Sequence, residues 1–395
     1  MTYTIEKVTT LIGARRYGDR DGNVGFILTD SRSLCFPEET LFFALKSERN
    51  DGHNYIPELY RRGVRNFVVS QVPKGYASDY PEANFLKVVN TLEALQRLAE
   101  RHRDEFNIPI VGITGSNGKT MVKEWLHQLL SPSMFVTRSP RSYNSQIGVP
   151  LSVWLLNEQT QVGVFEAGIS QPGEMLALRD IIQPTIAVLT YLGAAHQENF
   201  ESLEAKCREK IILFHDADTI VYNGDDKTVS GVVNEYKDYK GEKLFWSFRD
   251  TKAPFFVKNV EKKGNLSIIT YIYKGEEDSY SLPFIDEASV TNSIIAAVVS
   301  RRLGLSAEEL DKRMALLEPV AMRLEVKEGQ HGCTLINDSY NSDINSLDIA
   351  LDFMSRRPDH KGRRHTLILS DIFQSGESAK DLYHEVSDLC RKRGV

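Results

Sequence analysis

The chain has 395 residues, more than a single hydrophobic core usually serves, so we expect two or three domains. Hydrophobic residues make up 41% and charged residues 26% of the chain, as in a typical water-soluble globular protein. The formal net charge of −6 gives no sign of the clustered positive charge that nucleic acid or an anionic membrane requires, so we expect neither as a partner.

The first predicted domain covers residues 1–104. Short β-type runs at 41–45 and 66–69 precede a helical pattern at 91–104, TLEALQRLAERHRD, in which leucines recur every third residue. This mixture of short strands and an amphipathic helix predicts a small α/β domain.

The second predicted domain covers residues 105–317 and follows a break at Asn107-Ile108-Pro109. Its apolar runs alternate with helical patterns, and continuous apolar strands separated by helices indicate a parallel sheet that is covered on both faces. The four runs are IPIVGIT (108–114), QVGVFEAG (161–168), TIAVLTYLG (185–193) and DTIVYNG (218–224).

The third predicted domain covers residues 318–395 and follows a second break at Glu318-Pro319. The run CTLINDSYN, a helix, the run RHTLILSDI and the final helix KDLYHEVSDLCRKRG predict one and a half βαβ units of a Rossmann-like domain. A further strand would be expected after the last helix, so we expect this C-terminal domain to be incomplete.

The cysteines and the N-terminus indicate a cytoplasmic location. The four cysteines are far apart and form no Cys-x-x-Cys pair, so neither a zinc site nor a disulfide framework is expected. The N-terminal sequence MTYTIEKVTTLIG has no charged leader before a long apolar core. No stretch reaches the roughly 18 apolar residues of a membrane span.

A loop at residues 114–120, Thr-Gly-Ser-Asn-Gly-Lys-Thr, lies between an apolar strand and an amphipathic helix. Backbone N–H groups at a helix N-terminus bind phosphate, and glycines such as Gly115 and Gly118 allow close approach. Lys119 would neutralise phosphate oxygens and Thr120 would reach Mg²⁺. The strict P-loop pattern needs a glycine at position 113, but this chain has Gly112 and Ile113, so a plain glycine loop is the alternative.

Two later strands each end near a charged or polar side chain, Glu166 after VGVF and His196 after IAVLTYLGAA. Ligands of open α/β sheets bind at the carboxyl ends of the strands, so Thr120, Glu166 and His196 are expected to converge on a metal-phosphate site. Glu166 offers the hard oxygen ligand that Mg²⁺ prefers. The alternatives are a solvated loop carboxylate and a structural histidine.

Several motifs together resemble the ATP-dependent Mur ligases. They are GITGSNGKT (112–120), YNSQIGVP (143–150), FEAG (165–168), LGAAH ending at His196, and NDSYN (337–341), in this order. In the first domain, TDSR (29–32), LFFALKSERNDGHNYI (41–56) and RRGVRNFVV (61–69) resemble the substrate domain of the family's D-alanyl-D-alanine-adding subgroup. The resemblance implies a three-domain fold with a central ATPase domain.

The resemblance also implies roles for residues of the central domain. Lys119 matches the phosphate lysine, with Gly115, Asn117 and Gly118 in the same nucleotide-binding loop. Thr120, Glu166 and His196 match the residues that hold two Mg²⁺ ions, and Asn144 matches the asparagine beside the γ-phosphate. Lys210, in SLEAKCREKIILF, falls where the family has a lysine whose CO₂ adduct, a carbamate, binds metal. The family continues Lys-Gly-Glu-Ile, whereas this chain continues with Ile211-Ile212-Leu213, and an exposed helix lysine is the alternative.

Further roles are implied for nucleotide and substrate contacts. Asn292 matches the adenine-contacting asparagine, although Asp286-Glu287-Ala288-Ser289 replaces the usual Gly-x-His-Asn before it. Arg323 and Asp338 match the arginine and aspartate that reach ATP from the C-terminal side. After Asn341, the usual Ala-Asn-Pro is replaced by Ser-Asp-Ile. Ser31 and Arg32 match the uridine-diphosphate-binding stretch, with Lys46 and His53 as further candidates.

The resemblance implies an ATP-dependent ligase that adds D-Ala-D-Ala to UDP-N-acetylmuramoyl-tripeptide through an acyl phosphate, in peptidoglycan precursor synthesis. A relative that adds a diamino acid, or glutamate to folate, is one alternative. A nucleotide-binding relative without turnover is another, and a generic P-loop ATPase is a third that leaves the N-terminal domain and Asn144 unexplained.

Overall fold

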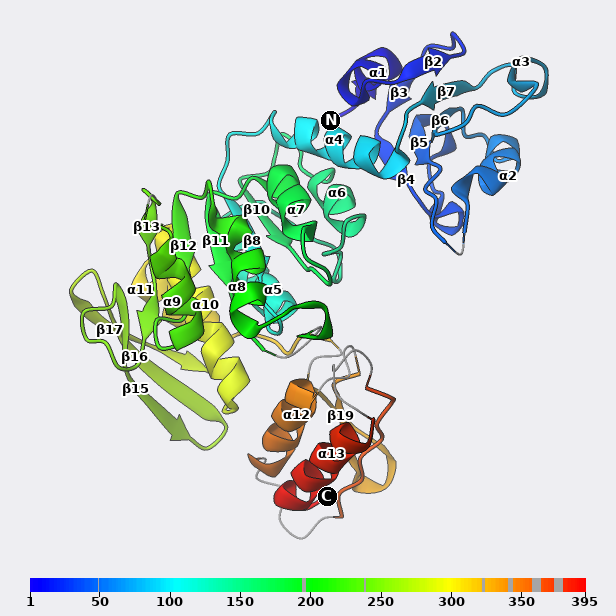
Figure 1. Cartoon of the computed structure of the whole chain (residues 1–395). Coiled ribbons are helices and arrows are strands. Elements are labelled where there is room, and N and C mark those ends of the chain that lie inside the picture. The colour runs from blue at the N-terminus through cyan, green and yellow to red at the C-terminus, as the bar shows by residue number, and fades with distance from the viewer. Residues whose placement is uncertain are drawn as a thin grey trace. The chain divides into compact units, whose positions relative to one another are not determined.

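The computed structural model describes residues 1–48, 50–193, 197–237, 239–321, 324–339, 344–356, 364–372 and 379–395 (Figure 1). The chain divides into two compact units. The first holds Met1–Ile108, Ser142–Thr160 and Asp180–Ile182, and the second holds Pro109–Arg141, Gln161–Arg179 and Gln183–Val395. The division into three domains with boundaries after residues 104 and 317 stays a prediction.

A five-stranded sheet forms the centre of the first unit, in the order β2-β7-β6-β5-β4. Its pairings are parallel except between β2 and β7. Alternate residues of β5 serve opposite faces, because Leu41 and Phe43 pack into one core cluster and Phe42 into another. The strands are β2 (Arg15–Tyr17), β4 (Phe26–Leu28), β5 (Thr40–Phe43), β6 (Asn66–Val69) and β7 (Asn84–Lys87), and a separate pair is β1 (Tyr3–Thr4) and β3 (Asn23–Val24).

The helices of the first unit include the one predicted at 91–104, which the structure confirms as α4 (Thr91–Arg103). Asn90 caps it by accepting a hydrogen bond from the Leu92 backbone at 2.9 Å, and Leu95 and Leu98 are fully buried. The other helices are α1 (Ile5–Ile12), α2 (Ile56–Arg61), α3 (Tyr76–Asp79) and α6 (Gly148–Val153).

The second unit contains the predicted parallel sheet, with six strands in the order β13-β12-β11-β8-β10-β9. The four apolar runs of the sequence form β8, β10, β11 and β12, which confirms them as strands. The strands are β8 (Ile110–Thr114), β9 (Val136–Arg138), β10 (Val162–Glu166), β11 (Ile186–Leu189), β12 (Thr219–Val221) and β13 (Glu242–Lys243).

Helices cover both faces of this sheet, as predicted. Val111 and Ile113 of β8 pack into a core cluster with α5 (Lys119–Leu130) and α10 (Glu287–Arg302). Figure 1 shows α8 (Leu203–Ile211) and α9 (Lys227–Glu235) on the opposite face. The chain runs from β8 outward to β9 in one direction and from β11 through β12 to β13 in the other. This reversal of strand order beside β8 is where open α/β sheets bind ligands.

A second, largely antiparallel sheet follows in the chain, in the order β14-β15-β16-β17, and the sequence analysis did not predict it. Its buried residues, such as Phe255 and Tyr271, pack into the same cluster as α5 and α10. The remaining elements are β14 (Trp246–Ser247), β15 (Phe255–Lys263), β16 (Leu266–Tyr273), β17 (Glu276–Leu282), α7 (Glu174–Ile182) and α11 (Ala307–Met314).

The C-terminal segment has its own small core, which includes Leu347, Leu351 and Leu382. The predicted strand in CTLINDSYN forms β19 (Thr334–Asn337), but it pairs antiparallel with β18 (Glu325–Glu328). The predicted strand at 364–372 is wrong, since that segment forms no strand. Its side chains at 367, 369 and 372 nevertheless pack against the core, which explains the strand-like apolar pattern. The helices are α12 (Ile344–Arg356) and α13 (Ala379–Arg393).

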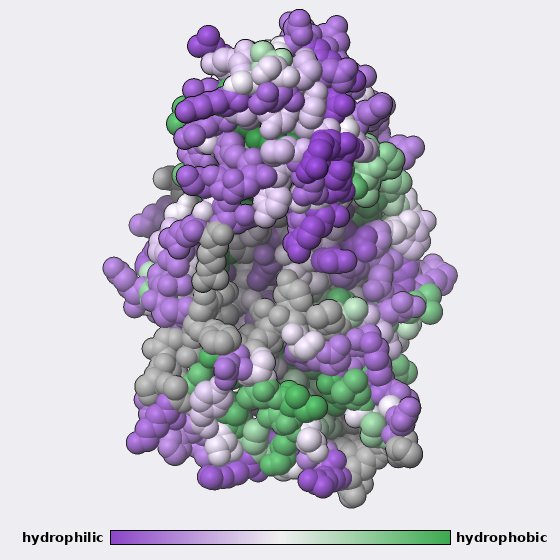
Figure 2. Space-filling model, turned by 90° about the vertical axis from the view of Figure 1, so that its right-hand side faces the viewer, coloured by the Kyte–Doolittle hydropathy of each residue, from purple (hydrophilic) through white to green (hydrophobic). Residues whose placement is uncertain are grey.

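Hydrophilic residues cover most of the visible face in Figure 2, as expected of a chain in which charged residues make up 26%. Among the described helices, none is long and apolar enough to cross a membrane.

Candidate functional site

The loop between β8 and α5 lies at the carboxyl edge of the central sheet. It is fastened to the end of β11, because Ser116 N donates to Tyr191 O at 2.6 Å and Thr190 Oγ1 donates to Asn117 O at 2.5 Å. The Lys119 ammonium group donates to the backbone carbonyls of Gly115 and Ser116, at 2.8 and 3.1 Å. The loop is therefore a preformed turn at the N-terminus of a helix, as phosphate binding requires.

Two glycines of the loop are required by the backbone and by close neighbours. Gly115 has a φ of 143° and Gly118 a φ of 88°. A Cβ atom at Gly118 would lie 2.5 Å from Asn292 Oδ1, and one at Gly115 would lie 2.1 Å from Thr190 Oγ1. Any other residue would clash at these positions and strain the backbone. The contact also places Asn292, on α10, directly against the loop.

Thr120 and Glu166 come together at this edge, as expected from their places after β8 and at the end of β10. Thr120 Oγ1 donates to Glu166 Oε2 at 3.2 Å, and the Glu166 side chain has no solvent exposure. The structure thus excludes the alternative of a solvated loop carboxylate. A threonine hydroxyl and a buried carboxylate are both hard oxygen donors, so this pair suits a magnesium ion.

Lys210 also reaches the loop, and the alternative of an exposed helix lysine is wrong. Its side chain is only 3% exposed, and its Nζ donates to Gly115 O at 3.4 Å. Burial, and then the nearby charges of Lys119 and Lys206, hold the pKa of Lys210 well below its usual range. This environment favours the neutral amine, which is the form that reacts with CO₂.

Two lysines of the site were not singled out from the sequence. Lys123 on α5 is fully buried, with its Nζ 3.1 Å from Glu166 Oε1. Lys206 on α8 is 1% exposed and donates to Gly193 O at 2.5 Å. The sequence offers a signal of burial for Lys123, because it lies between Val122 and the Trp-Leu pair of the buried helix face.

The remaining predicted residues of the nucleotide site are not brought to the loop by any described contact. His196 and Arg323 lie outside the described residues. Asn144 belongs to the first compact unit, whereas the loop belongs to the second. Asp338 follows β19 and accepts a hydrogen bond from the Leu324 backbone at 3.3 Å. The roles implied for these four residues stay predictions.

The predicted substrate residues of the first unit lie in two of its loops. Arg32 is 87% exposed at its side chain and pairs with Asp30 at 2.6 Å. His53 Nε2 accepts from the Ser70 backbone at 3.1 Å, so its Nδ1 carries the hydrogen and donates to Asp51 Oδ1 at 2.6 Å. The His53 backbone N–H also donates to Asp51 Oδ1, at 3.0 Å, and this bond, followed by the ring bond, lowers the pKa of Asp51.

Near those groups, the Lys46 ammonium lies 3.9 Å from Asp51 Oδ2, and Ser31 O accepts from Arg62 at 2.8 Å. The loops thus present an exposed guanidinium and an exposed ammonium group. Their roles in substrate binding stay predictions.

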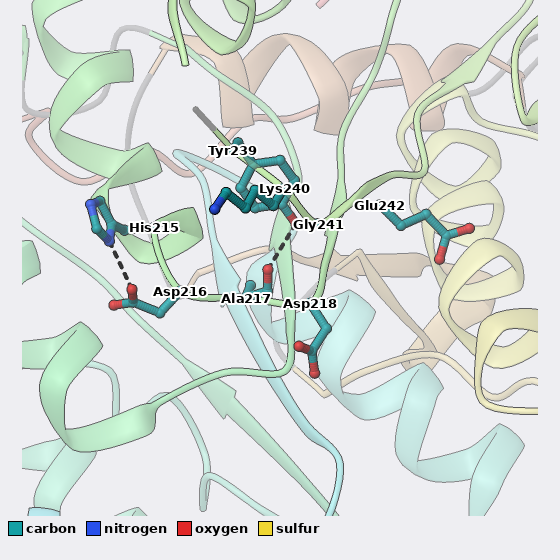
Figure 3. Close-up of a pocket in the computed structure, with 8 residues that line it drawn as sticks. All are labelled: His215, Asp216, Ala217, Asp218, Tyr239, Lys240, Gly241 and Glu242. Atoms are coloured by element: carbon teal, nitrogen blue, oxygen red, sulfur yellow. Dashed lines mark hydrogen bonds and ion pairs between the residues drawn. The ribbon is translucent and has the colours of Figure 1, made fainter. Parts of the chain in front are cut away.

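A surface hollow shown in Figure 3 is not part of this site. It is lined by residues that come just before β12 and β13, and Tyr239 Oη donates there to Ala217 O at 2.9 Å. Because these strands are parallel, their amino ends lie at the edge of the sheet opposite the phosphate loop. Its lining residues are His215, Asp216, Ala217, Asp218, Tyr239, Lys240, Gly241 and Glu242.

Comparison with protein families matches residues 113–300 to the Mur ligase middle domain. UDP-N-acetylmuramoyl-tripeptide–D-alanyl-D-alanine ligase of Bacillus subtilis is 28% identical over 368 residues, which cover 91% of this chain and 76% of that protein. The enzyme of the same name from Escherichia coli is 25% identical over 403 residues, covering 100% and 85%.

Solved structures share the fold. The crystal structure of MurF from Acinetobacter baumannii has a TM-score of 0.86 at 23% identity and covers 100% of this chain and 83% of that one. MurF of Thermotoga maritima, in complex with ADP, has a TM-score of 0.78 at 23% identity and covers 96% and 82%. Residues 113–300 thus match the Mur ligase middle domain, and the whole chain is similar to ligases of that family in sequence and in fold.

Proposed function

We propose that the chain is the ATP-dependent ligase that joins D-Ala-D-Ala to UDP-N-acetylmuramoyl-tripeptide, the reaction named for its relatives. The observation that carries this proposal is the phosphate-binding loop whose Thr120 meets the buried Glu166 at 3.2 Å, with Lys119 and Lys210 both against the Gly115 carbonyl of that loop. A simple nucleotide-binding loop needs neither the buried carboxylate nor the buried second lysine.

The chemistry required is activation of a carboxylate. A carboxylate is a poor electrophile, so the γ-phosphoryl group of ATP is transferred to it, giving an acyl phosphate and ADP. The amino group of D-Ala-D-Ala then attacks the acyl carbon, and inorganic phosphate leaves as the amide forms. Phosphoryl transfer depends mainly on positioning and on charge stabilisation.

The residues of the loop supply that positioning. Backbone N–H groups at the start of α5 bind phosphate oxygens, and the Lys119 ammonium follows the charge on the transferred group. In this proposal Asn144 orients the γ-phosphate, while Asn292, Arg323 and Asp338 hold the nucleoside. The contact of Asn292 with Gly118 supports its place in this set.

Two magnesium ions belong to the proposal, held by Thr120, Glu166, His196 and Lys210. When bound, they neutralise the phosphate oxygens during transfer. Among the residues that the structure describes, no three His, Cys, Asp or Glu side chains gather into a metal site. Phosphate oxygens and a modified Lys210 would therefore have to complete the coordination.

Lys210 suits that modification. The neutral amine attacks the carbon of CO₂ and loses a proton, which gives a carbamate whose oxygens are anionic. The environment that lowers its pKa therefore favours the reactive amine, and an unmodified lysine would offer magnesium no oxygen. In the first unit, Ser31, Arg32, Lys46 and His53 are proposed to bind the UDP-sugar peptide.

The test is phosphate release by the purified full chain with ATP and Mg²⁺. Release is expected only when UDP-N-acetylmuramoyl-tripeptide and D-Ala-D-Ala are both present, and Lys119→Ala should abolish it. Lys252→Ala, at an exposed lysine, is the matched control and should leave release unchanged.

Two outcomes would contradict the proposal. Incorporation of a single diamino acid into the dipeptide precursor, without use of D-Ala-D-Ala, would assign the chain to another ligase of the family. Nucleotide binding without release under any substrate combination would indicate a relative that has no turnover.

A further inference from the structure

Lys123, which pairs with Glu166 in the buried interior, has no role in the proposed chemistry. Lys123 lies one helical turn beyond Lys119 on α5, and both side chains of the pair have no solvent exposure. Removing two charges from water can cost more free energy than their mutual attraction returns. A buried ion pair is therefore weak evidence for a purely stabilising role.

The Lys123 ammonium group is fixed by groups from three parts of the second unit. It donates to Ser139 O at 2.9 Å, contacts Arg141 O, and lies 3.0 Å from Glu124 Oε1 in addition to Glu166 Oε1 at 3.1 Å. These four acceptors hold the ammonium group in place, with Glu166 Oε1 beside it as an ion-pair partner.

The two oxygens of Glu166 therefore have different partners. Oε1 faces Lys123 at 3.1 Å, whereas Oε2 accepts from Thr120 Oγ1 at 3.2 Å. The backbone of Glu166 is also held, because its N–H donates to Ser139 Oγ at 3.2 Å. Among the contacts described, Oε2 is the oxygen that meets the phosphate loop, through Thr120.

The number of carboxylate oxygens at a metal site affects which ion it prefers. Mg²⁺ is small and needs near-octahedral coordination, whereas Ca²⁺ accepts six to eight oxygens and often takes both oxygens of one carboxylate. A carboxylate with one oxygen already bound to an ammonium group is suited to the smaller ion.

We propose that Lys123 is a positioning residue that limits Glu166 to a single metal-facing oxygen and so makes the nucleotide site prefer Mg²⁺ over Ca²⁺. The inference rests on the magnesium site of the proposed function. It assigns metal selectivity to a lysine that lies one helical turn beyond the phosphate loop.

The experiment measures ADP binding to the full chain by calorimetry, with saturating Mg²⁺ and separately with saturating Ca²⁺. The ratio of the two dissociation constants reports metal preference without any ligase turnover. We expect Lys123→Met to reduce the preference for Mg²⁺ by about tenfold or more. This substitution keeps an unbranched side chain of four atoms and removes the charged ammonium group.

Arg103→Met is the matched control. Arg103 is a buried cation of the first unit whose Nε donates to Ile182 O at 3.0 Å and whose Nη1 donates to Phe106 O at 2.6 Å. Arg103→Met should lower the free energy of unfolding without changing the ratio of the two dissociation constants. An unchanged ratio in folded Lys123→Met would overturn the inference, and so would an equal change in both variants.

A measurement on the unmodified protein covers the case in which Lys123→Met does not fold. Infrared difference spectra, recorded as metal is added with ADP and compared with Glu166→Gln, distinguish a carboxylate that binds through one oxygen from one that binds through two. One-oxygen binding with Mg²⁺ is expected, and two-oxygen binding would overturn the inference. Metal-dependent ADP binding without ligation would count against the proposed function alone.

Discussion

His102 is expected to make the first unit lose stability as the pH falls below 6.5. The ring is 1% exposed, and its Nε2 lies 3.0 Å from Leu156 O. Because a carbonyl only accepts, Nε2 carries the hydrogen, and Nδ1 accepts from the Tyr3 hydroxyl at 2.8 Å. A second proton, on Nδ1, would force the Tyr3 hydroxyl to turn from donor to acceptor, and it would place a charge in a buried aromatic cluster with Trp154 and Phe106.

The magnitude follows from the pKa. Burial lowers the pKa of His102 from 6.5 to about 4, against a smaller raising effect of the Leu156 carbonyl. The unfolded chain therefore binds more protons between these values, so stability is complete above pH 6.5 and is lost as the pH falls toward 4. The full difference is about 3 kcal/mol, and about 2 kcal/mol of it is lost between pH 7.5 and pH 5.

The assay compares urea unfolding of the unmodified chain and His102→Gln at both pH values. A glutamine amide can donate to Leu156 and accept from Tyr3 but does not titrate in this range. Trp154, whose ring centroid lies 4.6 Å from that of His102, reports unfolding by fluorescence when both proteins carry Trp125→Phe and Trp246→Phe. The chain with His102 should lose about 2 kcal/mol more than the glutamine variant. Equal losses would refute the reasoning.

Three further predictions concern the phosphate loop. Gly118→Ala should weaken ADP binding at least tenfold in calorimetry, whereas Gly304→Ala, at a φ of 102° with no neighbour within 4 Å of the added atom, should change it little. Glu166→Gln removes the fully buried one of the two carboxylates that pair with Lys123, so urea unfolding should show a loss of about 3–5 kcal/mol, and a loss below 1 kcal/mol would contradict the pairing. With ¹³C-labelled bicarbonate, the chain should show a carbamate NMR signal that Lys210→Met removes, and an unchanged signal would place the carbamate elsewhere.

The sequence predicted the part of the site that depends on local pattern. Continuous apolar runs identified β8, β10, β11 and β12, because a parallel strand buried on both faces has no polar side. The position of Glu166 at the end of such a run was enough to place it at the sheet edge beside Thr120. Residues of this kind are predictable because the strand itself determines where the side chain emerges.

Features that depend on contacts distant in the sequence were missed. Trp154 Nε1 donates to Gly25 O, 129 residues away, and such contacts draw residues 142–160 into the first unit. The strand pattern at 364–372 was misread because side-chain packing produces the same alternation as strand pairing. The local sequence does not show whether a side chain will bind a distant carbonyl, or whether an apolar segment will find a neighbouring strand.

The lysines show why identical sequence patterns can carry different chemistry. Lys119 and Lys123 on α5, and Lys206 and Lys210 on α8, are each four residues apart, a spacing that on most helices marks a solvated face. The structure buries three of these lysines, Lys123, Lys206 and Lys210, and gives Lys123 and Lys210 different neighbours. Lys123 has the Glu166 carboxylate at 3.1 Å and donates to Ser139 O at 2.9 Å.

The neighbours of Lys210 differ from those of Lys123. It lies against the carbonyl of Gly115, with other ammonium groups close by, and these surroundings lower its pKa and favour the neutral amine. Different environments therefore give like groups different roles. One buried lysine is suited to fixing a carboxylate, and the other to gaining a negative charge through reaction with CO₂. The spacing alone predicts neither role, because the partner across the fold decides it.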